Sequence, residues 1–95
     1  MPEQTPTTST ATTHLKALSR LLPLWPQELA DTSIAGRRRR IALLRRALRA
    51  ERRRGLAGHW TYDLSRHAGL LACYRVEVAG LKDLEAGRLM EAHRH

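Results

Sequence analysis

Arginine is the residue type most able to do chemistry in this chain, and it is concentrated in one stretch. Residues 37–54 contain ten arginines and one acidic residue, Glu51. The formal charge of this stretch is +9, against −1 for residues 1–36 and 0 for residues 55–95, within a net charge of +8. Guanidinium groups bind phosphates and carboxylates through paired N–H donors. Any electrostatic function is therefore expected to lie on this stretch.

The other residues that could carry chemistry form no recognisable catalytic or metal site. His67 follows Asp63 by one helical turn, and such a pair can orient a general base, but no nucleophile accompanies it. We therefore interpret His67 as a structural or interface residue. Cys73 is the single cysteine, which excludes an intramolecular disulfide, and His93 and His95 do not have a zinc-site spacing. We expect no enzyme activity, no catalytic residue, no metal and no cofactor.

The arginines must be positioned by a helix over residues 33–54, with cap residues at its start. At 100° per residue, the apolar side chains between Ile41 and Ala50 occupy about half of the helical wheel. Most of the arginines occupy roughly the opposite 140°. These form the predicted nucleic-acid-binding face: Arg38, Arg39, Arg45, Arg46, Arg49, Arg52 and Arg53.

The ends of this helix carry exceptions to that division. Arg37, Arg40 and Arg54 fall within the apolar half, where we expect them to extend outward along their aliphatic stems. Glu51 also falls there and can pair with an arginine of its own or a neighbouring helix. Gly55 is expected to end the helix as a left-handed cap residue.

Two further helices are expected on either side of the arginine helix. Residues 1–12 are rich in Thr, Ser and Pro and are predicted to form a disordered tail. A first helix is predicted over residues 13–22, ended by Pro23. The last helix is predicted over residues 60–79, with a possible continuation over residues 81–92.

The last helix contains apolar residues at alternating spacings of four and three, which is the spacing of a heptad seam. We expect this seam to have a structural or interface role, and it comprises Trp60, Leu64, His67, Leu71, Tyr74, Val78 and Leu81.

These elements predict an all-α protein: a small helical hairpin or three-helix arrangement in a single domain, residues 13–95, behind the N-terminal tail. The chain contains no Phe, so its core must rest on Leu and Ala, and a homodimer that shares apolar surface remains an alternative. We expect a cytoplasmic protein, because no apolar run could span a bilayer and the N-terminus lacks the features of a signal peptide.

Four interpretations of the cationic face remain open. Nucleic-acid binding through phosphate contacts is the leading hypothesis. The second is a protein adaptor or regulatory subunit that binds an acidic protein through the basic face or through the Trp60–Leu81 seam. The third, association with a membrane surface, requires an apolar face that the fold itself needs. The fourth is a compositional bias with no function, since the chain has fifteen arginines and two lysines.

Overall fold

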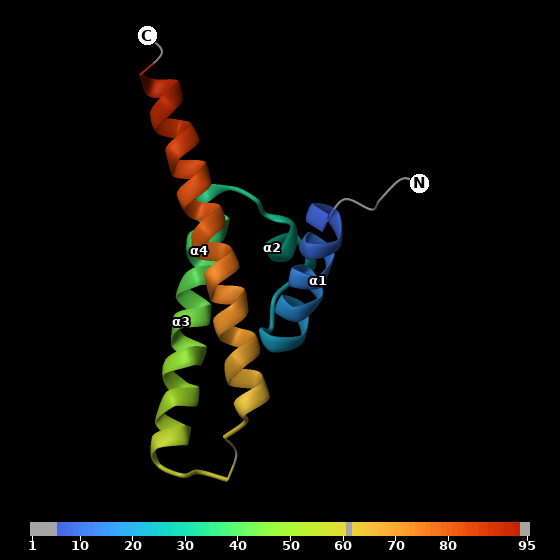
Figure 1. Cartoon of the computed structure of the whole chain (residues 1–95), viewed down its shortest axis with the longest axis vertical. Helices are drawn as coiled ribbons and strands as arrows, with labels where there is room; N and C mark the ends of the chain where they lie inside the picture. The colour runs from blue at the N-terminus through green and yellow to red at the C-terminus, as the bar shows by residue number, and fades with distance from the viewer. Residues whose placement is uncertain (1–5, 61, 94–95) are drawn as a thin grey trace.

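The computed structural model describes residues 6–60 and 62–93, and these residues form an all-α fold (Figure 1). The predicted fold class is confirmed. The helices of the described residues are α1 (Pro6–Leu21), α2 (Pro26–Ala30), α3 (Ile34–Leu56) and α4 (Leu64–Ala92).

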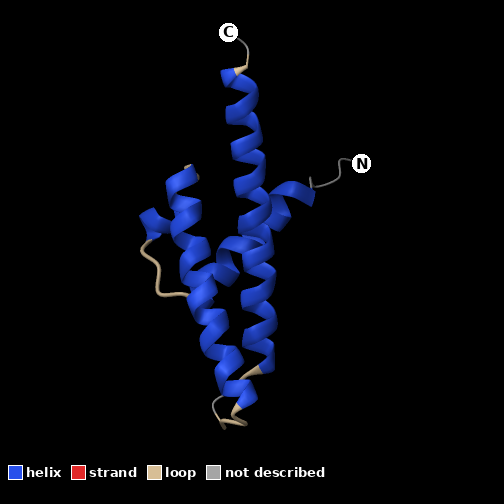
Figure 2. Ribbon diagram, turned by 90° about the vertical axis from the view of Figure 1, so that its left-hand side faces the viewer, coloured by secondary structure: helices blue, strands red, loops and turns tan. Residues whose placement is uncertain are grey.

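The two long helices, α3 and α4, form the predicted antiparallel hairpin. Figure 1 shows α1 packed against α4, with the short helix α2 beside α1. The C-terminal part of α4 extends beyond the start of α3, which Figure 2 shows most clearly. The central part of α4 therefore has neighbours on two sides, and its outer end has none within the described chain.

Helix α1 begins at Pro6, seven residues before the predicted start. The prediction of disorder is therefore wrong for residues 6–12, while residues 1–5 lie outside the described residues. Proline suits a first helical position because its missing N–H would have no intrahelical acceptor there. Once Leu18 and Leu22 are anchored in the core, each further residue adds a hydrogen bond, so the helix extends through weak helix formers.

Helix α3 begins as predicted and ends later than predicted. The Ser33 hydroxyl accepts a hydrogen bond from the Gly36 N–H (3.0 Å), and this caps the first turn. At the other end, Gly55 lies inside the helix, so its assignment as the cap residue is wrong. Gly58 takes that role with φ +64°. Its N–H donates to the Gly55 carbonyl (3.1 Å) and the His59 N–H donates to the Arg54 carbonyl (2.8 Å). This is the Schellman arrangement.

Helix α4 is continuous from Leu64 to Ala92, so the two predicted segments are one helix. Trp60 precedes it and is not helical. The Asp63 carboxylate accepts a hydrogen bond from the Arg66 N–H (3.0 Å) and so sets the helix start.

The apolar core of the described chain is small. It joins one side of the hairpin to α1 and consists of Leu18, Leu22, Leu44, Leu70 and Cys73. Ile41 on α3 is also buried. Among the described helices, none is both long and apolar enough to cross a membrane.

Gly58 and Gly87 provide a matched test of this backbone. Gly58→Ala is expected to lower the free energy of unfolding by about 1 kcal/mol, because a side chain disfavours the left-handed conformation. Gly87→Ala is expected to raise it by up to about 1 kcal/mol. Gly87 lies within α4, and a Cβ atom there would meet no atom within 4 Å. Urea unfolding followed by circular dichroism measures both, and equal effects of the two variants would contradict the assigned cap.

Candidate functional site

All seven arginines of the predicted face lie on the exposed side of α3. The separation that the helical wheel predicted is therefore present in the structure. Whether the face binds nucleic acid stays a prediction, but its side chains are available for a ligand.

Three of the seven contact other side chains of the chain. Arg38 pairs with Glu85 of α4 (2.8 Å), and Arg39 pairs with Asp31 before α3 (3.0 Å). The Arg45 Nε donates to the Tyr74 hydroxyl (3.3 Å), and its guanidinium lies 5.8 Å from the centre of that ring. Exposed ion pairs of this kind contribute at most about 1 kcal/mol, so a phosphate can replace the carboxylate partner.

The other four arginines, Arg46, Arg49, Arg52 and Arg53, have no hydrogen bond or ion pair within residues 6–60 and 62–93. We call these four the free stripe. At 100° per residue they fall within an arc of about 120°, and they extend along the helix axis by about 10 Å. The free stripe lies on the C-terminal half of α3, next to the turn of the hairpin.

The three arginines in the apolar half of the wheel do not extend freely outward. Arg40 is only 3% exposed, so the expectation for it is wrong. Its Nη1 donates to the backbone carbonyls of Glu28 and Asp31, both at 2.7 Å. Its Nε lies 3.1 Å from a carboxylate oxygen of Glu77. Arg40 therefore has a structural role, because it ties α3 to the residues around α2 and to α4.

Glu77, on α4, is the centre of a buried charge cluster and is 1% exposed. The His14 Nε2 lies 2.6 Å from one carboxylate oxygen, and the Arg37 Nη1 lies 3.3 Å from the other. A carboxylate only accepts hydrogen bonds, so the Nε2 of His14 carries the proton. We call Glu77, His14, Arg37 and Arg40 the Glu77 cluster.

The protonation of Glu77 depends on these partners. Burial alone would raise the pKa of its carboxyl group, since burial disfavours charge. The hydrogen bond from His14 and the charge of Arg40 outweigh burial, and the net pKa lies below its usual value of 4.5. Glu77 is therefore held as a carboxylate.

Glu51, the one acid among the arginines, is also buried and is 1% exposed. It pairs with Arg54 of its own helix (2.6 Å) and with Arg66 of α4 (3.3 Å). It also accepts the backbone N–H of Asp63 (3.3 Å). The predicted pairing, within α3 and to a neighbouring helix, is confirmed. Glu51 consequently fixes the end of α3 against the start of α4.

The predicted seam of α4 is displaced from the buried stripe. Leu70, Cys73 and Glu77 are the buried residues of α4, whereas His67, Leu71, Tyr74, Val78 and Leu81 are half-buried. Trp60 and Leu64 are exposed, so their structural assignment is wrong, and their interface role stays a prediction. A heptad seam assumes one partner helix. Helix α4 has two partners, and its buried stripe faces the space between them.

The Asp63–His67 pair does not form, because Asp63 caps α4 instead. The His67 Nδ1 lies 3.3 Å from the Tyr62 hydroxyl, and the two rings pack edge to face with centres 6.0 Å apart. This places His67 in the packing of the hairpin turn, as a structural interpretation requires.

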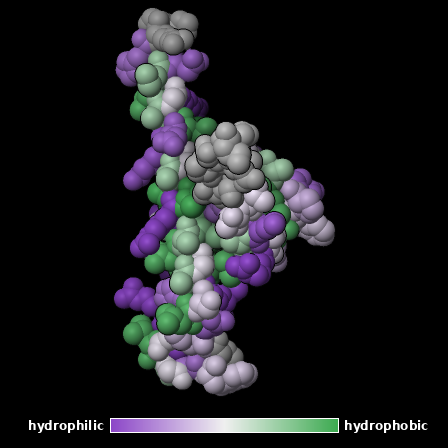
Figure 3. Space-filling model, turned by 45° about the vertical axis from the view of Figure 1, so that its right-hand side comes forward, coloured by the Kyte–Doolittle hydropathy of each residue, from purple (hydrophilic) through white to green (hydrophobic). Residues whose placement is uncertain are grey.

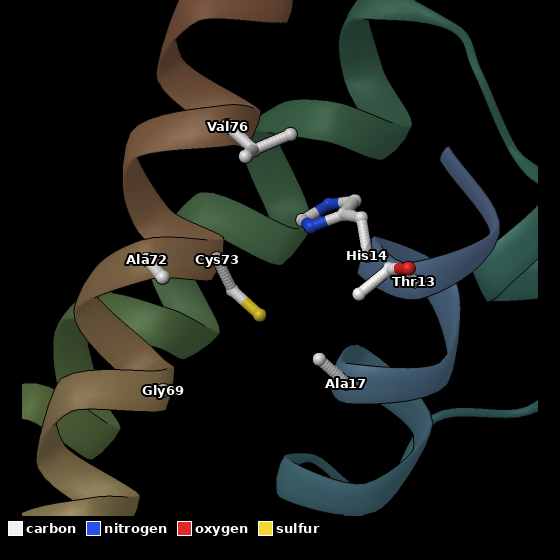
Figure 4. A pocket seen from close by; sticks show the side chains of 7 residues that line it. All are labelled: Thr13, His14, Ala17, Gly69, Ala72, Cys73 and Val76. Carbon is white, nitrogen blue, oxygen red and sulfur yellow. The ribbon is translucent and has the colours of Figure 1, made fainter. Parts of the chain in front are cut away.

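A groove of about 310 Å³ lies between α1 and α4, and sequence reasoning did not predict it. Small residues at Gly69 and Ala72 form one wall, and Figure 4 shows His14 and Cys73 directed into the groove from opposite helices. Burial raises the pKa of the Cys73 thiol, so the reactive thiolate form is disfavoured. The only signal in the sequence was the patch of small residues on α4.

The Glu77 cluster predicts a specific dependence of stability on pH. Because the folded-state pKa of Glu77 lies below the unfolded-state value, its contribution is complete above the unfolded pKa and disappears as pH falls through the folded pKa. We expect Glu77→Gln to lower the melting temperature at pH 7 and to flatten its decline between about pH 5 and pH 3.

Glu85→Gln is the control for that measurement, because Glu85 forms an exposed ion pair with Arg38. It is expected to change the melting temperature little and to keep the acid slope of the wild type. Identical acid slopes for the wild type and Glu77→Gln would show that the cluster does not govern acid stability.

Comparison with known proteins identifies no relative from which a role could be transferred. No protein-family model, curated protein or solved structure matches this chain. The function must consequently be inferred from the arrangement of the chain's own residues, and above all from the free stripe of α3.

Proposed function

We propose that this protein is a non-enzymatic nucleic-acid-binding protein that holds the phosphate backbone with the arginine face of α3. The supporting observation is the free stripe: Arg46, Arg49, Arg52 and Arg53 are exposed and have no partner within residues 6–60 and 62–93. A cytoplasmic location is part of the proposal, since Cys73 is free and suits a reducing compartment.

The geometry of the face suits a linear polyanion. The free stripe extends about 10 Å along the helix axis, and a nucleic acid presents several phosphates over that length, since duplex DNA carries one charge per 1.7 Å. Arg38, Arg39 and Arg45 extend the face toward the start of α3, and their exposed contacts can be exchanged for phosphate. The face contains no Asn or Gln, which read base edges, so contacts to the backbone are favoured over sequence readout.

The test replaces the four arginines of the free stripe by Gln and measures binding to random-sequence DNA and RNA at several salt concentrations. Each phosphate contact contributes about −0.9 to the slope of log K against log salt on duplex DNA. The variant is therefore expected to bind weakly, and its slope on duplex DNA should be less steep by about 3.6. Its helical circular dichroism should be retained, since a single surface substitution typically changes the free energy of unfolding by no more than roughly 0.5 kcal/mol.

A matched control separates the site from the charge of the whole protein. Lys16, Arg75, Lys82 and Arg88 are exposed cations outside the face, so replacing these four by Gln removes the same charge. The control is expected to retain most of the affinity and the slope. Equal losses in the two variants would show that net charge, and not the face, drives binding. Wild-type binding that is insensitive to salt would contradict the proposal itself.

A protein adaptor is the second candidate function, and the observation that favours it is exposed apolar surface on α4. Leu64, at the start of α4, is 71% exposed, and the half-buried seam continues from it along the helix. An acidic partner could contact this seam and the arginine face together.

Nuclease-treated pull-downs distinguish the adaptor from the nucleic-acid-binding protein. If the adaptor function is correct, a partner persists after nuclease treatment and is lost from Leu64→Gln, which lies on the seam. Leu89→Gln, at the far end of α4, serves as the control and is expected to retain that partner. Capture of nucleic acid alone, with no protein after nuclease treatment, would count against the adaptor.

A further inference from the structure

The arginine face ends in large apolar side chains that the fold does not use. Leu56, in the last turn of α3, is 80% exposed, and Trp60, in the turn that follows, is 88% exposed. At 100° per residue, Leu56 falls between Arg49 and Arg52 on the helical wheel, so it lies on the face itself. Figure 3 shows hydrophobic atoms at the lower end of the hairpin beside hydrophilic side chains.

Residues on either side of Trp60 form backbone hydrogen bonds, although the Trp60 side chain is exposed. The Schellman hydrogen bond joins the His59 N–H to the last turn of α3 (2.8 Å), and the Tyr62 N–H donates to the His59 carbonyl (3.0 Å). The rings of His59 and Trp60 stack with centres 6.0 Å apart and planes at 22°. Trp60 therefore lies at a hydrogen-bonded corner, seven residues after Arg53, the last arginine of the free stripe.

We propose that the nucleic acid bound by this face contains unpaired bases, and that Trp60 stacks on one of them. This inference rests on the proposed function and specifies its ligand as single-stranded RNA or DNA. Arg49, Arg52 and Arg53 hold successive phosphates of the strand, and Leu56 packs beside the stacked base. An arginine track that leads to an exposed aromatic ring is the combination by which proteins bind single strands without sequence preference. The bases of a paired duplex are stacked on one another, so Trp60 cannot stack on them in the same way.

A lipid surface also binds both cationic and apolar side chains. The arrangement of the arginine face and Trp60 favours a lipid surface less than a single-stranded nucleic acid. A membrane-bound helix lies in the interface with its apolar face toward the lipid. In α3 that face is buried in the fold through Ile41, Leu44 and Glu51. The free stripe extends along the helix axis, away from the tip, so an upright insertion of the tip would leave Arg46 and Arg49 at different depths. A strand lying along the helix meets all four arginines and then Trp60.

The experiment uses Trp25→Phe protein, in which Trp60 is the only tryptophan. Trp25 lies at the start of α2 and is itself exposed. The ligands are a thymidine and a uridine oligonucleotide of about 16 residues and a duplex of the same length. We expect the single strands to quench Trp60 fluorescence and to bind more tightly than the duplex.

Variants of the wild-type chain test the contribution of the ring. Trp60→Ala is expected to bind the single strands about tenfold more weakly, which is the effect of losing one stacked base. Trp60→Phe should recover most of that loss, since its ring still stacks. Trp25→Ala, the matched exposed tryptophan, should bind like the wild type. The salt slope should stay unchanged in all three, because the phosphate contacts remain.

The possible outcomes distinguish failure of the Trp60 stacking inference from failure of the proposed nucleic-acid binding. If salt-dependent binding persists but Trp60→Ala binds single strands like the wild type, the stacking inference is overturned and the arginine face stands. If Trp60 responds instead to vesicles of phosphatidylcholine and phosphatidylserine, with tighter binding than to the oligonucleotides, the tip is a lipid-binding loop and the inference is overturned. If neither single strands nor duplex bind at all, both proposals fail.

Discussion

The Glu77 cluster is the interaction on which the arrangement of the helices depends. A buried carboxylate is costly unless it is paired, and the partners of Glu77 come from different elements. His14 belongs to α1, while Arg37 and Arg40 belong to α3. Arg40 also bonds the carbonyl groups of Glu28 and Asp31, so α2 is tied to the same point. The apolar core contains few residues, and it is this polar cluster that gives α1 a defined position against α4.

The two buried glutamates divide the arginines of α3 by role. Glu77 and Glu51 take Arg37, Arg40 and Arg54, which point inward or along the hairpin. Arginines facing outward on the opposite side have no buried acid to neutralise. A compositional bias toward arginine accounts for the number of these residues. It does not account for the division between inward arginines that pair with buried acids and an outward face on which four arginines have no partner among the described residues. The stripe is therefore the part of the charge that the fold leaves unexplained.

Helical periodicity and cap residues were enough to predict the three long helices, the hairpin, the start of α3 near residue 33 and the exposure of the seven arginines, because each depends on neighbouring residues. Features that depend on distant residues were missed. The burial of Glu77 could not be predicted, because only the folded chain brings His14 and Arg40 to it. The buried stripe of α4 differs from the predicted heptad seam, because two helices pack on α4 and a heptad seam assumes one partner. Gly55 and Gly58 are three positions apart in the chain. The local sequence alone did not show which of them is the left-handed residue that ends α3.

Glu51 joins the scaffold to the candidate site. By pairing with Arg54 and Arg66 and accepting the N–H of Asp63, it fixes both the rotation of the last turns of α3 and the start of α4. Because Glu51 faces inward, Arg52 and Arg53, its neighbours in the chain, must project outward. The N–H groups of His59 and Tyr62 form hydrogen bonds in the turn that follows α3, and Trp60 lies in this turn. A small core can thus present a rigid charged stripe and an aromatic ring together, because buried ion pairs orient the helix ends that carry them.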